Sequence, residues 1–168
     1  MKNINSMVFL VFFVIFKTTE PAIADKKEDI YLIKEVFKKL ENIENSAVNN
    51  RKKLDKLMLS AINSKDTSKA TANKRGELLE KLVTNITNTL KSSMDVKTPN
   101  IENEKAKTHI AEAIDAHKHW SIAQSGRLKS IFEANTKDFK FFEEESKRYA
   151  EIEAYSFLLA DKVIENDK

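Results

Sequence analysis

Residues 29–64 read DIYLIKEVFKKLENIENSAVNNRKKLDKLMLSAINS and contain neither glycine nor proline. Their apolar residues recur at alternating spacings of four and three, which is typical of a helix that packs a narrow face against partner helices. The positions of this repeat are Val36, Leu40, Ile43, Ala47, Asn50, Leu54, Leu57 and Ala61. The stretch therefore predicts a long helix, and such a helix needs neighbours to cover its apolar face.

Two polar positions of this helix carry separate expectations. Asn50 either fixes the register of a buried seam or lies in water where the helix bends. We expect Asp25 or Asp29 to cap the start of the helix, because carboxylates accept hydrogen bonds from the free N–H groups there.

The rest of the chain predicts more helices, separated by two polar breaks. The breaks are residues 63–76, rich in Ser, Thr, Asn and Lys, and residues 92–100, which contain Pro99. The helices are a short one over 77–93 and two long ones over 101–134 and 137–166. The inward face of the last helix is expected to hold Phe139, Phe142, Tyr149, Ile152, Leu159 and Val163. The predicted fold class is all-α: an elongated antiparallel bundle of three long helices, with a loop and short helix (64–100) inserted between the first and second.

The composition agrees with a helical chain and excludes several other classes. The 168 residues include 2 Gly, 2 Pro and no Cys. This is too few turn residues for a β-sandwich, and without cysteine there are no disulfides and no thiolate metal sites. The formal net charge of +3 is nearly balanced, and the sequence shows no basic stripe that would indicate a nucleic-acid partner.

Residues 1–24 have the pattern of a secretory signal peptide. Residues 7–16 read MVFLVFFVIF, which is shorter than the roughly 20 apolar residues that span a bilayer. Ala22-Ile23-Ala24 follows and offers the small residues of a cleavage site. We therefore expect cleavage after Ala24, one helical-bundle domain over 25–168, and no stable membrane anchor after cleavage. The protein would be exported to the periplasm or cell surface, or secreted.

Catalytic and metal-binding patterns are missing from the sequence. His117 and His119 are two residues apart on a predicted helix and so point in nearly opposite directions, while Asp115 and His119 provide too few ligands for a metal. We expect His117 to be packed and His119 solvated. There is no Gly-x-Ser-x-Gly elbow and no glycine-rich phosphate loop. The expectation is a protein that is not an enzyme and uses no cofactor or metal.

Aromatic residues concentrate between Trp120 and Phe157. Phe141 and Phe142 diverge by about 100° around a helix, so the aromatics of this region cannot all face one core. Exposed aromatics often mark surfaces that bind partners. The candidate partner-binding residues are Phe139, Phe141, Phe142, Tyr155 and Phe157. The alternative is a bundle thick enough to bury all of them.

The order of segments resembles the minor pilus subunits of type IV secretion systems. The resemblance rests on the signal that ends Ala22-Ile23-Ala24, the long first helix over 30–62, the appendage over 64–100 and the two long C-terminal helices. It implies a subunit at the pilus tip or surface, with pilus components or host surface proteins as partners and no catalytic residues. Two alternatives stay open: a freely secreted effector or host-directed binding protein, and a carrier of a small apolar ligand with a pocket near Trp120.

Overall fold

The computed structural model describes residues 24–63 and 68–166, and within them the protein is all-α. Its helices are α2 (Ala24–Ile62), α3 (Lys69–Lys91), α4 (Glu104–Phe132) and α5 (Thr136–Asn166), with a 3₁₀ turn, η1 (Ser92–Asp95), after α3. None of these helices carries an apolar stretch long enough to cross a membrane. Apart from Ala24, the predicted signal peptide lies outside the described residues, and it stays a prediction.

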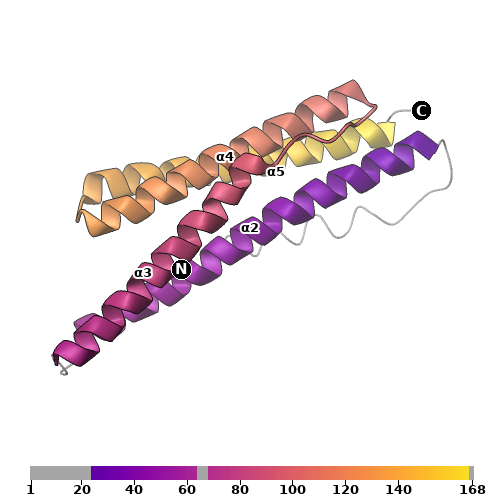
Figure 1. The fold of residues 1–168 in the computed structure, drawn as a ribbon. Coiled ribbons are helices and arrows are strands. Elements are labelled where there is room, and N and C mark those ends of the chain that lie inside the picture. Colours follow the sequence, from indigo (N-terminus) through magenta and orange to yellow (C-terminus); the bar gives the residue numbers. More distant parts are fainter. Residues whose placement is uncertain (1–23, 64–67, 167–168) are drawn as a thin grey trace.

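The helices form two hairpins (Figure 1). α4 and α5 lie side by side and run antiparallel. α2 runs along this pair, and α3 returns from the far end of α2 towards the middle of the bundle. An extended segment then leads from η1 to the start of α4. The turn ends of the two hairpins lie apart, so the bundle is open at that end.

The predicted fold class is wrong in describing three long helices with a short helical insertion. The structure has four helices rather than three long ones with a short insertion, because α3 begins at Lys69 and not near residue 77. Ser68 starts it by accepting a hydrogen bond from the Thr71 N–H at 3.3 Å. Ala, Lys and Arg in the first turns favour helix, and Gly76 costs only about 1 kcal/mol there. The Ser, Thr and Asn residues of this stretch are typical of loops, so the sequence pattern did not predict this part of the helix.

Two groups of buried side chains hold the helices together. The first joins the N-terminal half of α2, the extended segment, the start of α4 and the end of α5, and centres on Leu40, Ile110 and Phe157. The second joins α2, α3 and α4 through Ala47, Leu54, Ile86, Leu90, Trp120 and Leu128, and the half-buried Tyr149 and Ala150 of α5 pack against it. Both contain residues of the predicted seam of α2, and five of its positions are buried: Val36, Leu40, Ile43, Ala47 and Leu54. Asn50 is half-buried.

The distal part of the α2–α3 hairpin has little to bury. Among the described residues between positions 55 and 85, no side chain is buried. Leu59 and Leu78 are exposed there. The contribution of this part of the hairpin to the core is limited to half-buried side chains that pack against the second buried group, namely Met58, Leu79, Leu82 and Val83.

The inward face of α5 differs from the predicted one. Ile152 was expected inside and is 41% exposed, whereas Phe157, Ala160 and Ile164 are buried. Two serines, Ser146 and Ser156, also lie on the buried side. Serine is not recognised as a core residue in a hydrophobic pattern. The inward face predicted from the large apolar residues alone was therefore wrong.

Asp29 has a different role from the expected cap of its own helix. It is 4% exposed, and its two carboxylate oxygens accept hydrogen bonds from the N–H groups of Glu102 and Asn103, at 2.9 and 3.0 Å. Asn103 then caps α4 by accepting the Ala106 N–H. Asp29 therefore ties the start of α2 to the start of α4.

The turn between α4 and α5 is closed by backbone hydrogen bonds. The Asn135 N–H donates to the Ser130 carbonyl at 2.9 Å and the Ala134 N–H to the Ile131 carbonyl at 3.2 Å, which is the pattern of a Schellman motif. Ala134 has a left-handed backbone, with φ of 52°. Asn135 also caps α5 by accepting the Asp138 N–H at 3.1 Å.

Candidate functional site

The five candidate aromatics do not form one surface. Phe157 is 2% exposed and lies edge-on to Phe37, with ring centroids 5.3 Å apart. Phe139 is half-buried beneath the Arg127 guanidinium, 4.9 Å from its ring centroid. Phe141 and Tyr155 are exposed.

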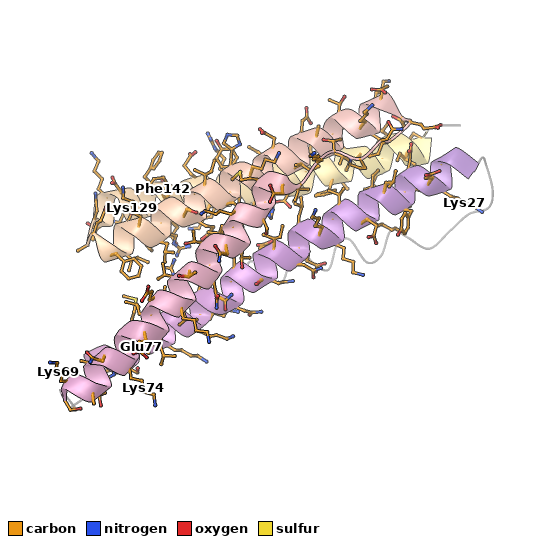
Figure 2. The ribbon with its side chains drawn as sticks, viewed as in Figure 1. Lys27, Lys69, Lys74, Glu77, Lys129 and Phe142 are labelled. Carbon is orange, nitrogen blue, oxygen red and sulfur yellow. The ribbon has the colours of Figure 1, made fainter. Side chains whose placement is uncertain are left out.

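Phe142, the fifth aromatic, packs on α4 at a glycine. Figure 2 shows it on α5 towards the turn end of the α4–α5 hairpin. A Cβ atom added to Gly126 would lie 2.5 Å from the Phe142 ring. Gly126 therefore lies inside the continuous helix α4 at the point where the Phe142 ring leaves no room for a side chain.

An exposed face of α5 combines aromatic, aliphatic and arginine side chains. Phe141, Ile152 and Tyr155 are 57%, 41% and 61% exposed. With 3.6 residues per turn they fall within about 60° of one another, over roughly 21 Å of helix. Arg148 lies on the same side, and its Nη2 donates to Glu145 Oε2 and to the Tyr149 hydroxyl, both at 2.9 Å. We call Phe141, Arg148, Ile152 and Tyr155 the α5 face.

A histidine and its neighbouring carboxylates lie inside the bundle, where α2, α4 and α5 meet. His117 of α4 has no exposed surface, and its Nδ1 is 2.9 Å from Oε2 of Glu153 on α5. Its Nε2 is buried with no hydrogen-bond partner among the described residues. The imidazole also stacks on Trp120, with ring centroids 5.1 Å apart.

Glu44 of α2 completes this buried cluster. Burial is the main cause that raises the pKa of Glu44 above its ordinary value, and the carboxylates of Glu153 and Glu41 add to it. His117 acts in the opposite direction and lowers that pKa. Glu44, His117 and Glu153 therefore form an electrostatically coupled group of two acids and one base, which joins α2, α4 and α5.

The surroundings of the other histidines are simpler. His109 Nδ1 lies 3.0 Å from Glu112 Oε2, and His119 stacks on Tyr149 with ring centroids 4.9 Å apart. The His119 side chain is 45% exposed and its Nδ1 lies 3.4 Å from Asp115 Oδ2. Over residues 24–63 and 68–166, no three His, Asp or Glu side chains are arranged to hold a metal ion.

The region around Trp120, suggested for an apolar ligand, is closely packed. The indole is 4% exposed and belongs to the second buried group with Leu54, Leu90 and Leu128. A ligand beside Trp120 would require these side chains to move apart.

A partly buried arginine pair lies near the open end of the bundle. Burial is the main cause that lowers the pKa of Arg127, and the nearby Arg51 adds to it. Glu143 and Asp55 oppose this shift, with Arg127 Nη2 lying 3.5 Å from Glu143 Oε1 and Arg51 Nε 3.0 Å from Asp55 Oδ1. The formal charges of the two arginines and the two carboxylates sum to zero, and the group joins residues of α2, α4 and α5.

The sequence placed the members of the buried cluster on separate helices without joining them. The sequence predicts that His117 is packed, and Glu44 follows the seam residue Ile43. A charged residue beside a seam and a histidine within an apolar face are the signals that indicate such a group.

Comparison with models of protein families, with curated proteins and with solved structures finds no match to this chain. The function is therefore inferred from the chain's own residues.

Proposed function

We propose that this chain is an exported, non-enzymatic helical protein that acts through protein–protein contacts made by the α5 face. The observation that carries the proposal is the side-by-side exposure of Phe141, Ile152 and Tyr155 around Arg148. Aromatic and arginine side chains are enriched among the residues that dominate binding energies at protein interfaces. Export rests on the sequence of residues 1–24 alone.

The α5 face is suited to a partner because little of it is used inside the bundle. Phe141 touches Phe142 edge-on, with ring centroids 5.2 Å apart, and both Phe141 and Tyr155 keep more than half of their surface exposed. Burying an aromatic side chain of this kind contributes about 1.5–3 kcal/mol. Two such residues and an isoleucine on one helix face can therefore anchor a partner.

A minor pilus subunit, or adhesin, is the more specific version of this proposal. It is supported by the predicted signal and by long helices with a contact surface near the C-terminus. The four-helix fold removes one of its supports, because the resemblance to minor pilus subunits assumed three long helices with a short appendage. The pilus version therefore depends on its own test.

A photo-crosslinking experiment tests the contact. The crosslinking amino acid p-benzoylphenylalanine replaces Phe141 or Tyr155 in the producing cell, and in separate chains it replaces Leu59 or Leu78. These leucines are matched controls because they are exposed apolar residues on other helices. We expect a crosslink to one discrete protein from positions 141 and 155 and none from 59 and 78. The same yield at all four positions would contradict the proposal.

Cell fractionation tests the location and the pilus version. The chain from the cell surface or medium is expected to start at Asp25, and the pilus version requires it in sheared pilus fractions. Full-length protein retained in the cytoplasm would contradict export. A free monomer found only in the medium would contradict the pilus version and favour the secreted alternative.

A further inference from the structure

A shallow groove lies between α2 and the extended segment that precedes α4. Its volume is about 430 Å³. The floor is apolar and is formed by Leu32 and Val36 of α2 together with Val96 and Pro99. Val36 and Val96 are themselves buried in the first core group, so the floor is a fixed part of the fold.

Three lysines line this groove against a single acid. They are Lys38 and Lys39 of α2 and Lys97 of the extended segment, and the acid is Glu35. All three lysines are exposed, and none forms an ion pair within the described part of the chain. The lining is therefore positively charged, which favours an anionic occupant.

The extended segment also presents main-chain groups. Val96 has φ of −74° and ψ of 124°, and the stretch to Ile101 contains no helix (Figure 1). The Val96 N–H donates to Ser93 and the Ile101 N–H to Pro99. The N–H groups of Lys97 and Thr98 donate no hydrogen bond to the described residues. Main-chain donors without an internal partner, on exposed residues beside a groove, suit an extended peptide, which pairs through its own backbone.

We propose that this groove docks an extended acidic peptide segment of a partner protein. Apolar side chains of the peptide lie on the floor of the groove, where Leu32 and Pro99 are half-buried, and its carboxylates pair with Lys38, Lys39 and Lys97. The proposal goes beyond the α5 face, because the groove is built from α2 and the 96–99 segment and shares no residue with it.

Peptide selection on the full-length chain tests the proposal. A library of random twelve-residue peptides is selected on the immobilised protein, and the affinity of the enriched peptides is measured by fluorescence anisotropy. We expect enrichment of peptides in which Asp or Glu alternates with apolar residues. Methyl NMR signals of Val36 and Val96 are expected to shift on binding.

Charge-reversed variants locate the site. K38E/K39E/K97E should weaken binding about tenfold or more. The matched variant K52E/K53E/K56E reverses three exposed lysines further along α2 and should change affinity less than threefold. K97A alone should lower the affinity for the peptide by a smaller factor. This single variant replaces the triple variant as the test if the triple variant loses its helical circular dichroism.

Four outcomes overturn the proposal: no enrichment, enriched peptides without excess acidic residues, equal loss of binding in both triple variants, and self-association that shifts the groove methyl signals. The last outcome would identify a second copy of the chain as the occupant. F141S/Y155S is expected to leave peptide binding unchanged. This variant therefore separates the proposal that the α5 face binds a partner from the proposal that the groove binds a peptide.

Discussion

His117 lies in the core with no exposed surface, and its neighbours explain how an ionisable side chain is tolerated there. Glu153 satisfies one ring nitrogen at 2.9 Å, Trp120 covers the ring, and Glu44 lies close enough to interact electrostatically. A buried pair of this kind adds little net stability, but removing one partner leaves the other uncompensated.

Replacing His117 alone is therefore expected to be costly. His117→Leu should lower the free energy of unfolding by roughly 3–5 kcal/mol, because Glu153 loses its partner inside the bundle. H117L/E153L should recover most of this loss, since two apolar side chains then replace the pair. Urea unfolding followed by circular dichroism measures both.

His119→Leu is the control for this pair, because His119 lies two residues away and is half-exposed, and it should cost about 1 kcal/mol or less. A single His117 variant as stable as the native chain, or a double variant no better than the single one, would show that the pair does not hold the cluster together.

Glu44 gives the buried cluster a pH dependence with a definite sign. Because burial raises its pKa in the folded state above the ordinary 4.5, the protonated carboxyl fits the fold better than the charged one. The stabilisation is complete below the unfolded-state pKa and is lost as the pH rises through the raised folded-state pKa. Asp161 acts in the same direction, since burial first and Glu165 second raise its pKa.

Glu44→Gln imitates the protonated form at every pH. The variant should therefore be more stable than the native chain at pH 7, and the difference should shrink as the pH falls towards 4. Urea unfolding at several pH values measures it, with the exposed Glu151→Gln as the control. A constant difference between pH 4 and pH 7 would rule out titration of Glu44 as its cause.

At the scale of helices, the sequence was reliable where a helix buries a regular apolar face. The seam of α2 is such a case, and five of its positions are buried. The first half of α3 could not be found this way, because no side chain there is buried and its residues are mostly polar. The role of Asp29 was also hidden, since it bonds to residues more than 70 positions away and no local spacing encodes that contact.

Asp29 offers a direct test of how α2 and α4 are joined. Asp29→Ala removes the side-chain acceptor of two partly buried hydrogen bonds from main-chain N–H groups and should cost about 2 kcal/mol of unfolding free energy. Amide exchange at Glu102 and Asn103 should speed up specifically. Glu28→Ala, at an exposed neighbouring position, should change neither quantity. If exchange at both amides stays slow in the Asp29 variant, another group must hold this segment.

The whole molecule combines a well-buried region with a thinly covered end. Both buried groups lie along α4 and the first four-fifths of α2, whereas the distal α2–α3 hairpin has no buried side chain among its described residues between 55 and 85. Stability is therefore unevenly distributed, because local opening is easiest where few apolar contacts are lost. The candidate surfaces on α5 and beside Val96 both lie on the better-buried part of the fold.

Amide hydrogen exchange should map this difference. Amides of residues 72–80 in α3 are expected to open with only about 1–2 kcal/mol, while those of residues 110–121 in α4 approach the global unfolding free energy of about 5–15 kcal/mol. Native-state exchange measured by NMR gives both values in one sample. Equal protection in the two segments would mean that the distal hairpin is covered by something other than its own two helices.

Ala134 gives the turn between α4 and α5 a stereochemical consequence. It is the one non-glycine residue among those described with a positive φ, and neither Gly76 nor Gly126 uses a left-handed backbone. An L-residue pays about 1–2 kcal/mol in this conformation, whereas the mirror-image amino acid prefers it. Chemical synthesis with D-alanine at position 134 should therefore stabilise the protein more than Ala134→Gly does, because the D-residue also keeps the unfolded chain restricted. Handedness at a single carbon atom thus becomes a way to strengthen the fold without changing its composition.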